Sequence, residues 1–270
     1  MKNKLKFSYK SFLIKIIRVV FLSYFAILIF LYFNQKNMIY YPNHPKEKNF
    51  FDCPYYKQNE KKIYKNTRFY ERKGEKNNII VFFHGNAGGM CDRKYIKELL
   101  EKTGNSIIMV EYYGYSDGPG IKPNISNILK DVKNIGEYLE NKNYNKIYVM
   151  GRSIGTGPAS YFSKNFKTDK LVLISPYSQL YKVARNKYPY IPVKLIFSEN
   201  YNNEKYLENY ENKLLIIHGE KDNIIPLKLG EELFNKINNK NKRFLKIKNG
   251  NHNDLFYKTE VNKEISEFLE

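Results

Sequence analysis

The segment Gly151–Gly155, which reads GRSIG, has the residue types and spacing of a nucleophile site. A strand-like apolar run, Lys146–Met150, precedes it, and the small residues 156–160 that follow can open a helix. A serine between a strand and a helix adopts a strained backbone that lifts its hydroxyl above the sheet, and the flanking glycines leave room for that turn. The pattern predicts that Ser153 is a nucleophile beside the positive end of a helix.

A serine nucleophile needs a general base, and the chain contains four histidines. His44 lies in a proline-flanked segment near the N-terminal apolar stretch. His84 and His218 each close an apolar run and are followed by glycine, where a histidine generally serves as a structural residue. His252 stands in a loop, 249–254, between a strand-like run and the last amphipathic segment. We therefore predict that His252 is the base.

The base in turn needs an acid that orients its ring. The run Leu214–His218 is a strand, and the loop after it contains Asp222. Because this loop lies between the serine and the histidine in the chain, Asp222 is the predicted acid. The alternative is that Asp222 only forms a turn, and the neighbouring carboxylates Glu220 and Asp254 are expected to matter less.

Acyl transfer also requires donors for the developing oxyanion. The apolar run Asn78–Phe83 is a predicted buried strand, and a glycine-rich turn follows it at 84–89. The backbone N–H groups of Asn86, in this turn, and of Ile154, directly after the nucleophile, are the predicted oxyanion donors.

These residues lie in six segments: HGNAGG at 84–89, EYYGYSDGPG at 111–120, GRSIGTGPAS at 151–160, SPYSQL at 175–180, HGEKDNIIP at 218–226 and GNHNDL at 250–255. With these segments the chain resembles the α/β-hydrolase superfamily, in which the serine, the acid and the histidine follow in this order. Within it, the chain looks like the membrane-associated group of Bem46-like, ABHD13 and ABHD17 serine hydrolases. The resemblance implies long-chain lipid esters or protein thioesters as substrates. One departure is that Tyr115 runs straight into Ser116, without a further glycine.

The strand-like runs alternate with helical ones, which predicts an α/β fold with a mainly parallel sheet and helices on both faces. The predicted core strands are 79–83, 106–111, 146–150, 170–175, 214–218 and 243–247. The more polar run Ile63–Glu71 predicts a single antiparallel edge strand before them. The segment Tyr177–Tyr210 interrupts this rhythm and is expected to form a small cap. About 230 residues, 37–270, suit one catalytic domain.

The N-terminal segment has a different composition. Phe12–Phe33 is almost wholly apolar, and as a helix it would reach about 33 Å, enough to cross a bilayer if Lys15 and Arg18 extend to the headgroups. A cleaved signal peptide would need small residues after the apolar core, and the chain continues LYFNQK instead. We predict an uncleaved anchor, with a cytoplasmic basic tail and transmembrane helix in residues 1–36.

The charges around this anchor predict its orientation. Before the uncharged core stand Lys2, Lys4, Lys6, Lys10, Lys15 and Arg18, against Lys36, Lys46 and Lys48 after it. The positive-inside rule places the N-terminus in the cytoplasm and the catalytic domain across the membrane.

The net charge of +19 raises the possibility of nucleic-acid or anionic-lipid binding. Abundant lysine, asparagine and isoleucine fit a compositional bias better, and the chain has no nucleic-acid-binding motif, so we expect no nucleic-acid partner. Cys53 and Cys91 could pair in an oxidising compartment or stay free. Scattered histidines and the lack of a phosphate-loop lysine predict neither a metal nor another cofactor.

The sequence thus predicts a membrane-anchored serine hydrolase that cleaves carboxylic ester or thioester bonds of an acyl substrate through an acyl-enzyme intermediate. Two alternatives use the same fold. One is a serine peptidase or acyltransferase with the same triad, and the other is a noncatalytic membrane scaffold.

Overall fold

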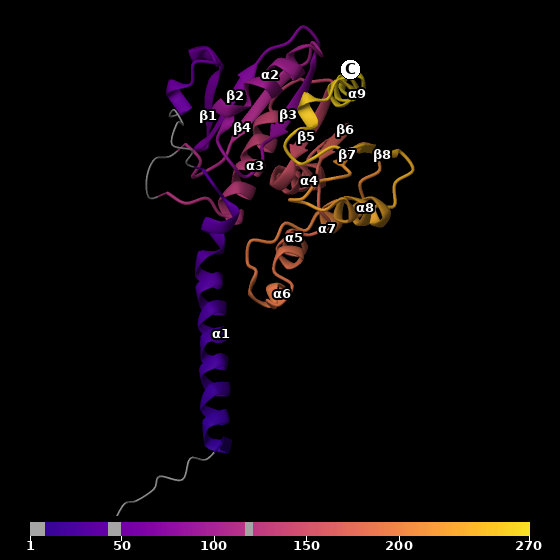
Figure 1. The fold of residues 1–270 in the computed structure, drawn as a ribbon. Coiled ribbons are helices and arrows are strands. Elements are labelled where there is room, and N and C mark those ends of the chain that lie inside the picture. The colour runs from indigo at the N-terminus through magenta and orange to yellow at the C-terminus, as the bar shows by residue number, and fades with distance from the viewer. Residues whose placement is uncertain (1–8, 43–49, 117–120) are drawn as a thin grey trace, which may run out of the picture.

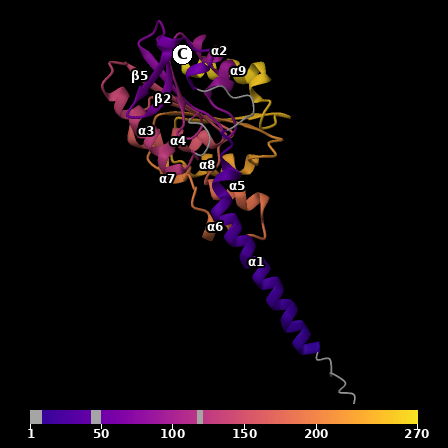
Figure 2. The same cartoon turned by 90° about the vertical axis from the view of Figure 1, so that its left-hand side faces the viewer.

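The computed structural model describes residues 9–42, 50–116 and 121–270. In this part of the chain an eight-stranded sheet is covered by helices on both faces, and a long helix, α1 (Tyr9–Ile39), leaves the body as a separate rod (Figures 1 and 2). The strands are β1 (Lys61–Tyr64), β2 (Thr67–Arg72), β3 (Asn78–Phe83), β4 (Ser106–Glu111), β5 (Lys146–Arg152), β6 (Lys170–Ile174), β7 (Lys213–Gly219) and β8 (Lys242–Ile247).

The sheet order is β1-β2-β4-β3-β5-β6-β7-β8. The strands from β4 to β8 pair in parallel, so their carboxyl ends all open at one edge of the sheet, which is where such folds place their sites. The central strands β3 to β7 are apolar on both faces, as helix-covered parallel strands must be. The predicted α/β-hydrolase fold with its mainly parallel sheet is confirmed.

Each face of the sheet has its own set of helices and its own apolar core. On one face α3 (Ile125–Glu140), α4 (Thr156–Asn165) and α8 (Leu227–Lys236) bury Val132, Phe162 and Leu233 against the strands. On the other face α2 (Lys94–Glu101) and α9 (Thr259–Leu269) bury Leu100 and Ile265. The sheet is therefore a rigid middle layer from whose edge the connecting loops extend.

The antiparallel edge predicted for Ile63–Glu71 is present, but it consists of two strands and not of one. The chain turns back at Lys65 and Asn66, both at positive φ (48° and 71°), so the run becomes a hairpin of β1 and β2. Two successive residues at positive φ give the tight turn that matches the twist of paired strands. Only β2 pairs with the parallel core, antiparallel to β4.

The predicted cap is present between β6 and β7. It contains α5 (Leu180–Lys187), α6 (Val193–Ile196) and α7 (Asn203–Tyr206). α6 is the part of the body that reaches farthest along α1 (Figure 1). α1 itself continues to Ile39, three residues past the predicted anchor boundary at 36, and it is long and apolar enough to cross a membrane.

Cys53 and Cys91, which the sequence left undecided, form a disulfide with their Cα atoms 5.6 Å apart. Cys91 lies in the short helix η3 (Met90–Arg93), directly after the glycine-rich turn that follows β3. The bridge therefore ties this turn to the segment that precedes β1.

Candidate active site

Ser153 stands at a sharp turn between β5 and α4, in the short helix η4 (Ser153–Gly155). Its φ is 55°, a left-handed value that a serine adopts only under strain. A Cβ on Gly151 would lie 2.5 Å from the carbonyl oxygen of Gly155, and one on Gly155 would lie 2.3 Å from that of His84. The two flanking glycines are therefore required by contact with backbone, as the elbow geometry demands.

The structure brings the three predicted catalytic side chains together although they come from three loops. Ser153 Oγ lies 2.9 Å from His252 Nε2, and His252 Nδ1 lies 2.7 Å from Asp222 Oδ2. All three residues are buried, at 6–7% exposure. Because an ionised carboxylate only accepts, His252 must donate from Nδ1, and this leaves Nε2 free to accept the serine proton. The arrangement has the hydrogen-bond directions that base-activated nucleophilic attack requires.

Asp222 is held by more than the histidine. Its Oδ1 accepts from the N–H groups of Ile224 (3.0 Å) and Ile225 (2.8 Å), and His218 Nε2 lies 3.4 Å from Oδ2 and 2.8 Å from the Ile225 carbonyl. Burial disfavours the ionised form, but the hydrogen bonds from His218, His252 and the Ile225 backbone together hold the pKa of Asp222 below its ordinary value. The carboxylate is thus fixed in both charge and orientation.

The loop that carries His252 is fastened to the nucleophile strand. Arg152 donates to the carbonyl of His252 (3.2 Å) and to Asn253 Oδ1 (3.1 Å). Asp254 closes the same loop, where its carboxylate accepts from the backbone N–H of Asn251. Glu220 is exposed. The structure therefore places Asp222, and neither neighbouring carboxylate, on the histidine.

The glycine-rich turn passes directly over the serine. A Cβ on Gly85 would lie 3.5 Å from the Cβ of Ser153. The Gly85 carbonyl accepts from His84 Nδ1 at 2.7 Å, which fixes the peptide plane whose N–H belongs to Asn86. The Asn86 carbonyl accepts from the Tyr115 hydroxyl (2.9 Å) and from the backbone N–H of Tyr41 (3.0 Å). The peptides on both sides of Asn86 are thus immobilised, as a preorganised donor must be.

His84 and His218 are structural, as expected, but the sequence did not show what they support. His84 is fully buried, and its ring stacks on Tyr112 with the centroids 4.0 Å apart. Burial, with the charge of Arg93, lowers the pKa of His84 well below its ordinary value, so the ring is neutral and carries its proton on Nδ1. One histidine therefore positions the Asn86 peptide and the other positions the acid.

A buried carboxylate, Glu111, lies behind the same turn. It is the last residue of β4, and its Oε2 accepts from the N–H of Met90 at 2.8 Å. Burial raises the pKa of Glu111 to about 7 from an ordinary value of 4.5, against the lowering effect of the Met90 N–H. The carboxyl is therefore neutral in the folded protein over much of the range in which it would ionise after unfolding.

This shift predicts a specific pH dependence of stability. The folded state holds the Glu111 proton more tightly than the unfolded state does. The protonated carboxyl therefore adds its full share to the unfolding free energy below about pH 4.5, and this share is lost as the pH rises through about 7. Glu111→Gln stays neutral at every pH, so its unfolding free energy relative to wild type should rise between pH 5 and pH 8, by up to about 3 kcal/mol. Urea unfolding of both chains at the two pH values measures this difference. A difference that is the same at both would contradict the assignment.

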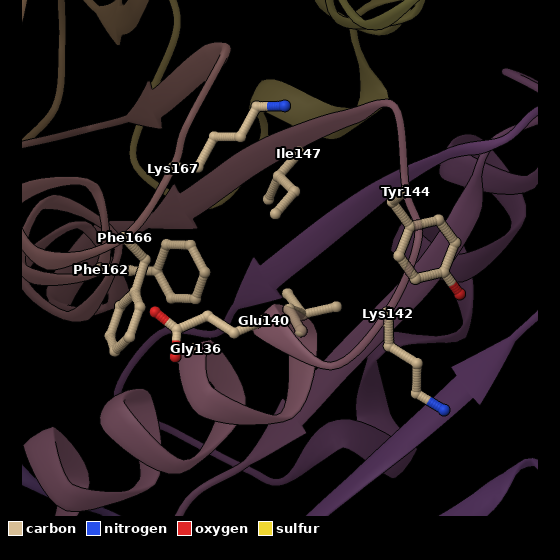
Figure 3. Close-up of a pocket in the computed structure, with 9 residues that line it drawn as sticks. Gly136, Glu140, Lys142, Tyr144, Ile147, Phe162, Phe166 and Lys167 are labelled. Atoms are coloured by element: carbon tan, nitrogen blue, oxygen red, sulfur yellow. The ribbon is translucent and has the colours of Figure 1, made fainter.

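The pocket shown in Figure 3, with a cavity volume of about 230 Å³, lies away from the triad. Its lining includes Tyr144, which precedes β5, Ile147 at the start of β5, Phe162 in α4, and Phe166 directly after α4. Ser153 follows the opposite end of β5. Of the other sequence features, His44 and the loop residues 117–120 lie outside the described residues, which contain no cluster of three or more metal-binding side chains.

Comparison with known proteins agrees with this architecture. A family model described as an alpha/beta hydrolase of unknown function (DUF1057) matches residues 56–188. The lysophosphatidylserine lipase ABHD12 of Xenopus tropicalis is 29% identical over 181 residues, which cover 58% of this chain and 46% of that protein. An uncharacterized protein of Mycobacterium tuberculosis is 26% identical over 178 residues, 65% of this chain and 63% of its own length. The chain thus spans about half of the first of these two relatives and just under two thirds of the second.

Solved structures share the fold at low identity. The Pyrococcus furiosus esterase Pf2001 superposes with a TM-score of 0.64 at 16% identity, over 77% of this chain and 90% of that one. Est1E from Butyrivibrio proteoclasticus gives 0.61 at 17% identity, over 77% and 97%. The sheet topology, the serine elbow and these matches agree. The chain has the α/β-hydrolase fold, and in sequence it is similar to proteins of the α/β-hydrolase superfamily.

Proposed function

We propose that the chain is a membrane-anchored serine hydrolase that cleaves the carboxylic esters of acyl lipids. The observation that carries the proposal is the continuous hydrogen-bonded series from Ser153 through His252 to Asp222, beneath the immobilised turn of Asn86. Such a series raises the nucleophilicity of a serine that would otherwise be inert at neutral pH.

The geometry supports a two-step reaction. Ser153 Oγ attacks the ester carbonyl while its proton moves to His252 Nε2, and the N–H groups of Asn86 and Ile154 bind the oxyanion. The carbon–oxygen bond to the leaving alcohol breaks, and the alcohol takes the proton from His252. Water then attacks the acyl-enzyme by the same route, so that a carboxylic acid is released and Ser153 is restored.

A lipid ester is the substrate class that we favour. The first support is the relative named a lysophosphatidylserine lipase, which aligns with more than half of this chain. The second is α1, whose exposed apolar surface would hold the catalytic domain beside a bilayer. An acyl thioester has a carbonyl that the same serine can attack, so acyl thioesters are the second substrate class that we propose.

A substrate panel tests the reaction. The full-length chain in detergent should hydrolyse an aryl acetate, a lysophospholipid and an acyl thioester, whereas a peptide amide should stay intact because amine leaving groups are poorer. The Ser153→Ala chain serves as the blank. Hydrolysis of the amide alone would replace the proposal with a peptidase, and inertness toward the whole panel would favour a scaffold.

We further propose that residues 1–36 hold the basic tail and the membrane span, that 37–270 form the catalytic domain, and that this domain lies on the side opposite the cytoplasm. Lys10, Lys15 and Arg18 stand on the N-terminal side of the uncharged core, whereas Lys36 stands at its other end. Lys2, Lys4, Lys6, Lys46 and Lys48, which enter the same charge count, lie outside the described residues. The Cys53–Cys91 disulfide supports this side, because disulfides persist in oxidising compartments.

This topology predicts four results. The chain should stay in the membrane pellet through salt and carbonate washes, and protease added to the cytoplasmic side of sealed vesicles should leave the domain intact. Its two cysteines should react with a maleimide only after reduction.

A chain that begins at Asn37 should be soluble and still hydrolyse a short-chain ester, because it keeps Tyr41 and every residue of the triad. Digestion of the domain from the cytoplasmic side would reverse the orientation, and release by salt alone would remove the anchor.

A further inference from the structure

The segment Tyr188–Phe197, which we call the cap tip, follows α5, contains α6 and projects past the rest of the body beside α1. Both ribbon views place α6 next to the upper part of the helix (Figures 1 and 2). The cap tip lies on the side of the body from which α1 leaves, so it would meet whatever surrounds α1.

Hydrogen bonds set the cap tip at a defined height on α1. The Tyr24 hydroxyl donates to the carbonyl of Tyr190 at 2.9 Å. Nearer the C-terminal end of α1, Gln35 donates to the Ile196 carbonyl (3.3 Å) and accepts from the Ser198 N–H (2.8 Å). Gln35 is also the residue of α1 that is buried. The cap tip is therefore fixed to the helix at both its ends.

These contacts indicate how deep the cap tip would lie in a bilayer that α1 spans. Tyr24 and Gln35 are separated by about 16 Å along the helix at 1.5 Å per residue. Tyr24 lies within the uncharged core of the helix, whereas Lys36 marks the end nearest the body. Because the hydrocarbon layer is about 30 Å thick, a spanning α1 would carry Tyr190 well into the adjacent leaflet.

The chemistry of the cap tip suits that depth. Tyr190 is 90% exposed and Leu195 is 83% exposed, although both are large and hydrophobic. The stretch from Tyr188 to Val193 has no charge, and it is flanked by Lys187 and Lys194. Such a run between two cations is typical of segments that lie at the boundary between acyl chains and anionic headgroups.

Part of the backbone of the cap tip is hydrogen-bonded within the protein, which lowers the cost of an apolar medium, where an unsatisfied N–H is costly. The N–H groups of Ile191 and Val193 donate within the tip, at 3.2 and 2.7 Å. Pro189 and Pro192 have no N–H to satisfy. The Tyr190 carbonyl has the Tyr24 hydroxyl as its donor.

We propose that the cap tip inserts into the leaflet from which the catalytic domain emerges, with Tyr190 and Leu195 among the acyl chains and Lys187 and Lys194 at anionic headgroups. The inference rests on the proposed anchoring by α1. It also makes the lipid surface a docking partner of the cap, and not only of the anchor.

The absence of tryptophan from the chain allows a direct test. Tyr190→Trp creates a sole tryptophan in the cap tip, Phe30→Trp creates one in α1, and Ile63→Trp creates one on β1, away from α6 in Figure 1. Each full-length chain is reconstituted in vesicles of phosphatidylcholine and phosphatidylglycerol with or without brominated acyl chains. Bromine quenches only tryptophans that lie in the acyl region.

We expect quenching at positions 30 and 190 and none at 63. Quenching at 30 without quenching at 190 overturns the insertion of the cap tip and leaves the anchor standing. Lack of quenching at both 30 and 190 removes the anchor, and the insertion falls with it.

A second variant tests the functional consequence. Leu195→Glu places a charge on an exposed side chain, so the fold should be unaffected. We expect the rate of hydrolysis of a vesicle-embedded acyl ester to fall about tenfold, because the variant loses the free energy of burying a leucine side chain among the acyl chains. The rate of hydrolysis of a soluble short-chain ester should not change. Ile63→Glu should change neither rate. Equal rates of Leu195→Glu and wild type on the embedded ester would overturn the role of the cap tip.

Discussion

Replacing Ser153 with alanine is expected to abolish both ester hydrolysis and labelling by a fluorophosphonate probe. The hydroxyl lies 2.9 Å from His252 Nε2, so the imidazole is placed to take its proton during attack on the ester. In serine hydrolases with a comparable triad, loss of the serine costs about 10⁶ in turnover. Turnover of a chromogenic short-chain ester and gel fluorescence after probe labelling measure the two effects.

The chain contains a matched control for this change. Ser160 is fully buried one turn into α4, and its hydroxyl donates to the carbonyl of Thr156. Ser160→Ala removes a comparable hydroxyl but should keep full labelling. His252→Ala should be as damaging as Ser153→Ala, and the double variant should be no worse, because the two residues act as one unit. Labelling of Ser153→Ala at the wild-type rate would exclude this serine as the nucleophile.

The sequence was sufficient to predict the core strands and the three loops of the site for a physical reason. In a parallel sheet each buried strand is a continuous apolar run, and the loop after it opens at the same edge. β5, β7 and the loop after β8 therefore place Ser153, Asp222 and His252 close together without any knowledge of the helices. The catalytic roles of these residues, and of the Asn86 and Ile154 N–H groups, stay predictions until the variants are measured.

The features that the sequence did not reveal depend on contacts between distant segments. Tyr41 holds the Asn86 carbonyl across more than forty residues, and the Cys53–Cys91 pair forms only after both segments are placed. His84 and His218 looked alike, because each ends an apolar strand. Only the structure shows that one supports the Asn86 peptide and the other the acid. The Lys65–Asn66 turn left a local signal, since asparagine tolerates positive φ, but the polar run around it resembled one strand.

Asp222→Asn is expected to lower turnover by about 10⁴ while the chain stays folded. The reason lies in the groups that hold the carboxylate. Oδ1 accepts from the N–H groups of Ile224 and Ile225, so an asparagine must keep its carbonyl oxygen there. Its amide NH₂ then faces His252 Nδ1, which can no longer donate and must accept. The ring is thereby forced to carry its proton on Nε2, where it cannot take the proton of Ser153, and a comparable tautomer error costs about 10⁴ in a serine protease.

Glu220→Gln is the matched control, since it removes an exposed carboxylate two residues away and should leave turnover unchanged. A second measurement compares the unfolding free energies of wild type and Asp222→Asn at several pH values, and it shows whether the variant is inactive while still folded. Because the pKa of Asp222 is held below its ordinary value, the ionised carboxylate stabilises the native wild-type chain above that ordinary value, and this contribution is lost as the pH falls. The Asn variant lacks the contribution, so wild type should lose more stability than the variant on acidification. If Glu220→Gln were the crippling change and Asp222→Asn were active, the acid would be misassigned, and the hydrogen bond between Asp222 and His252 would have only a structural role.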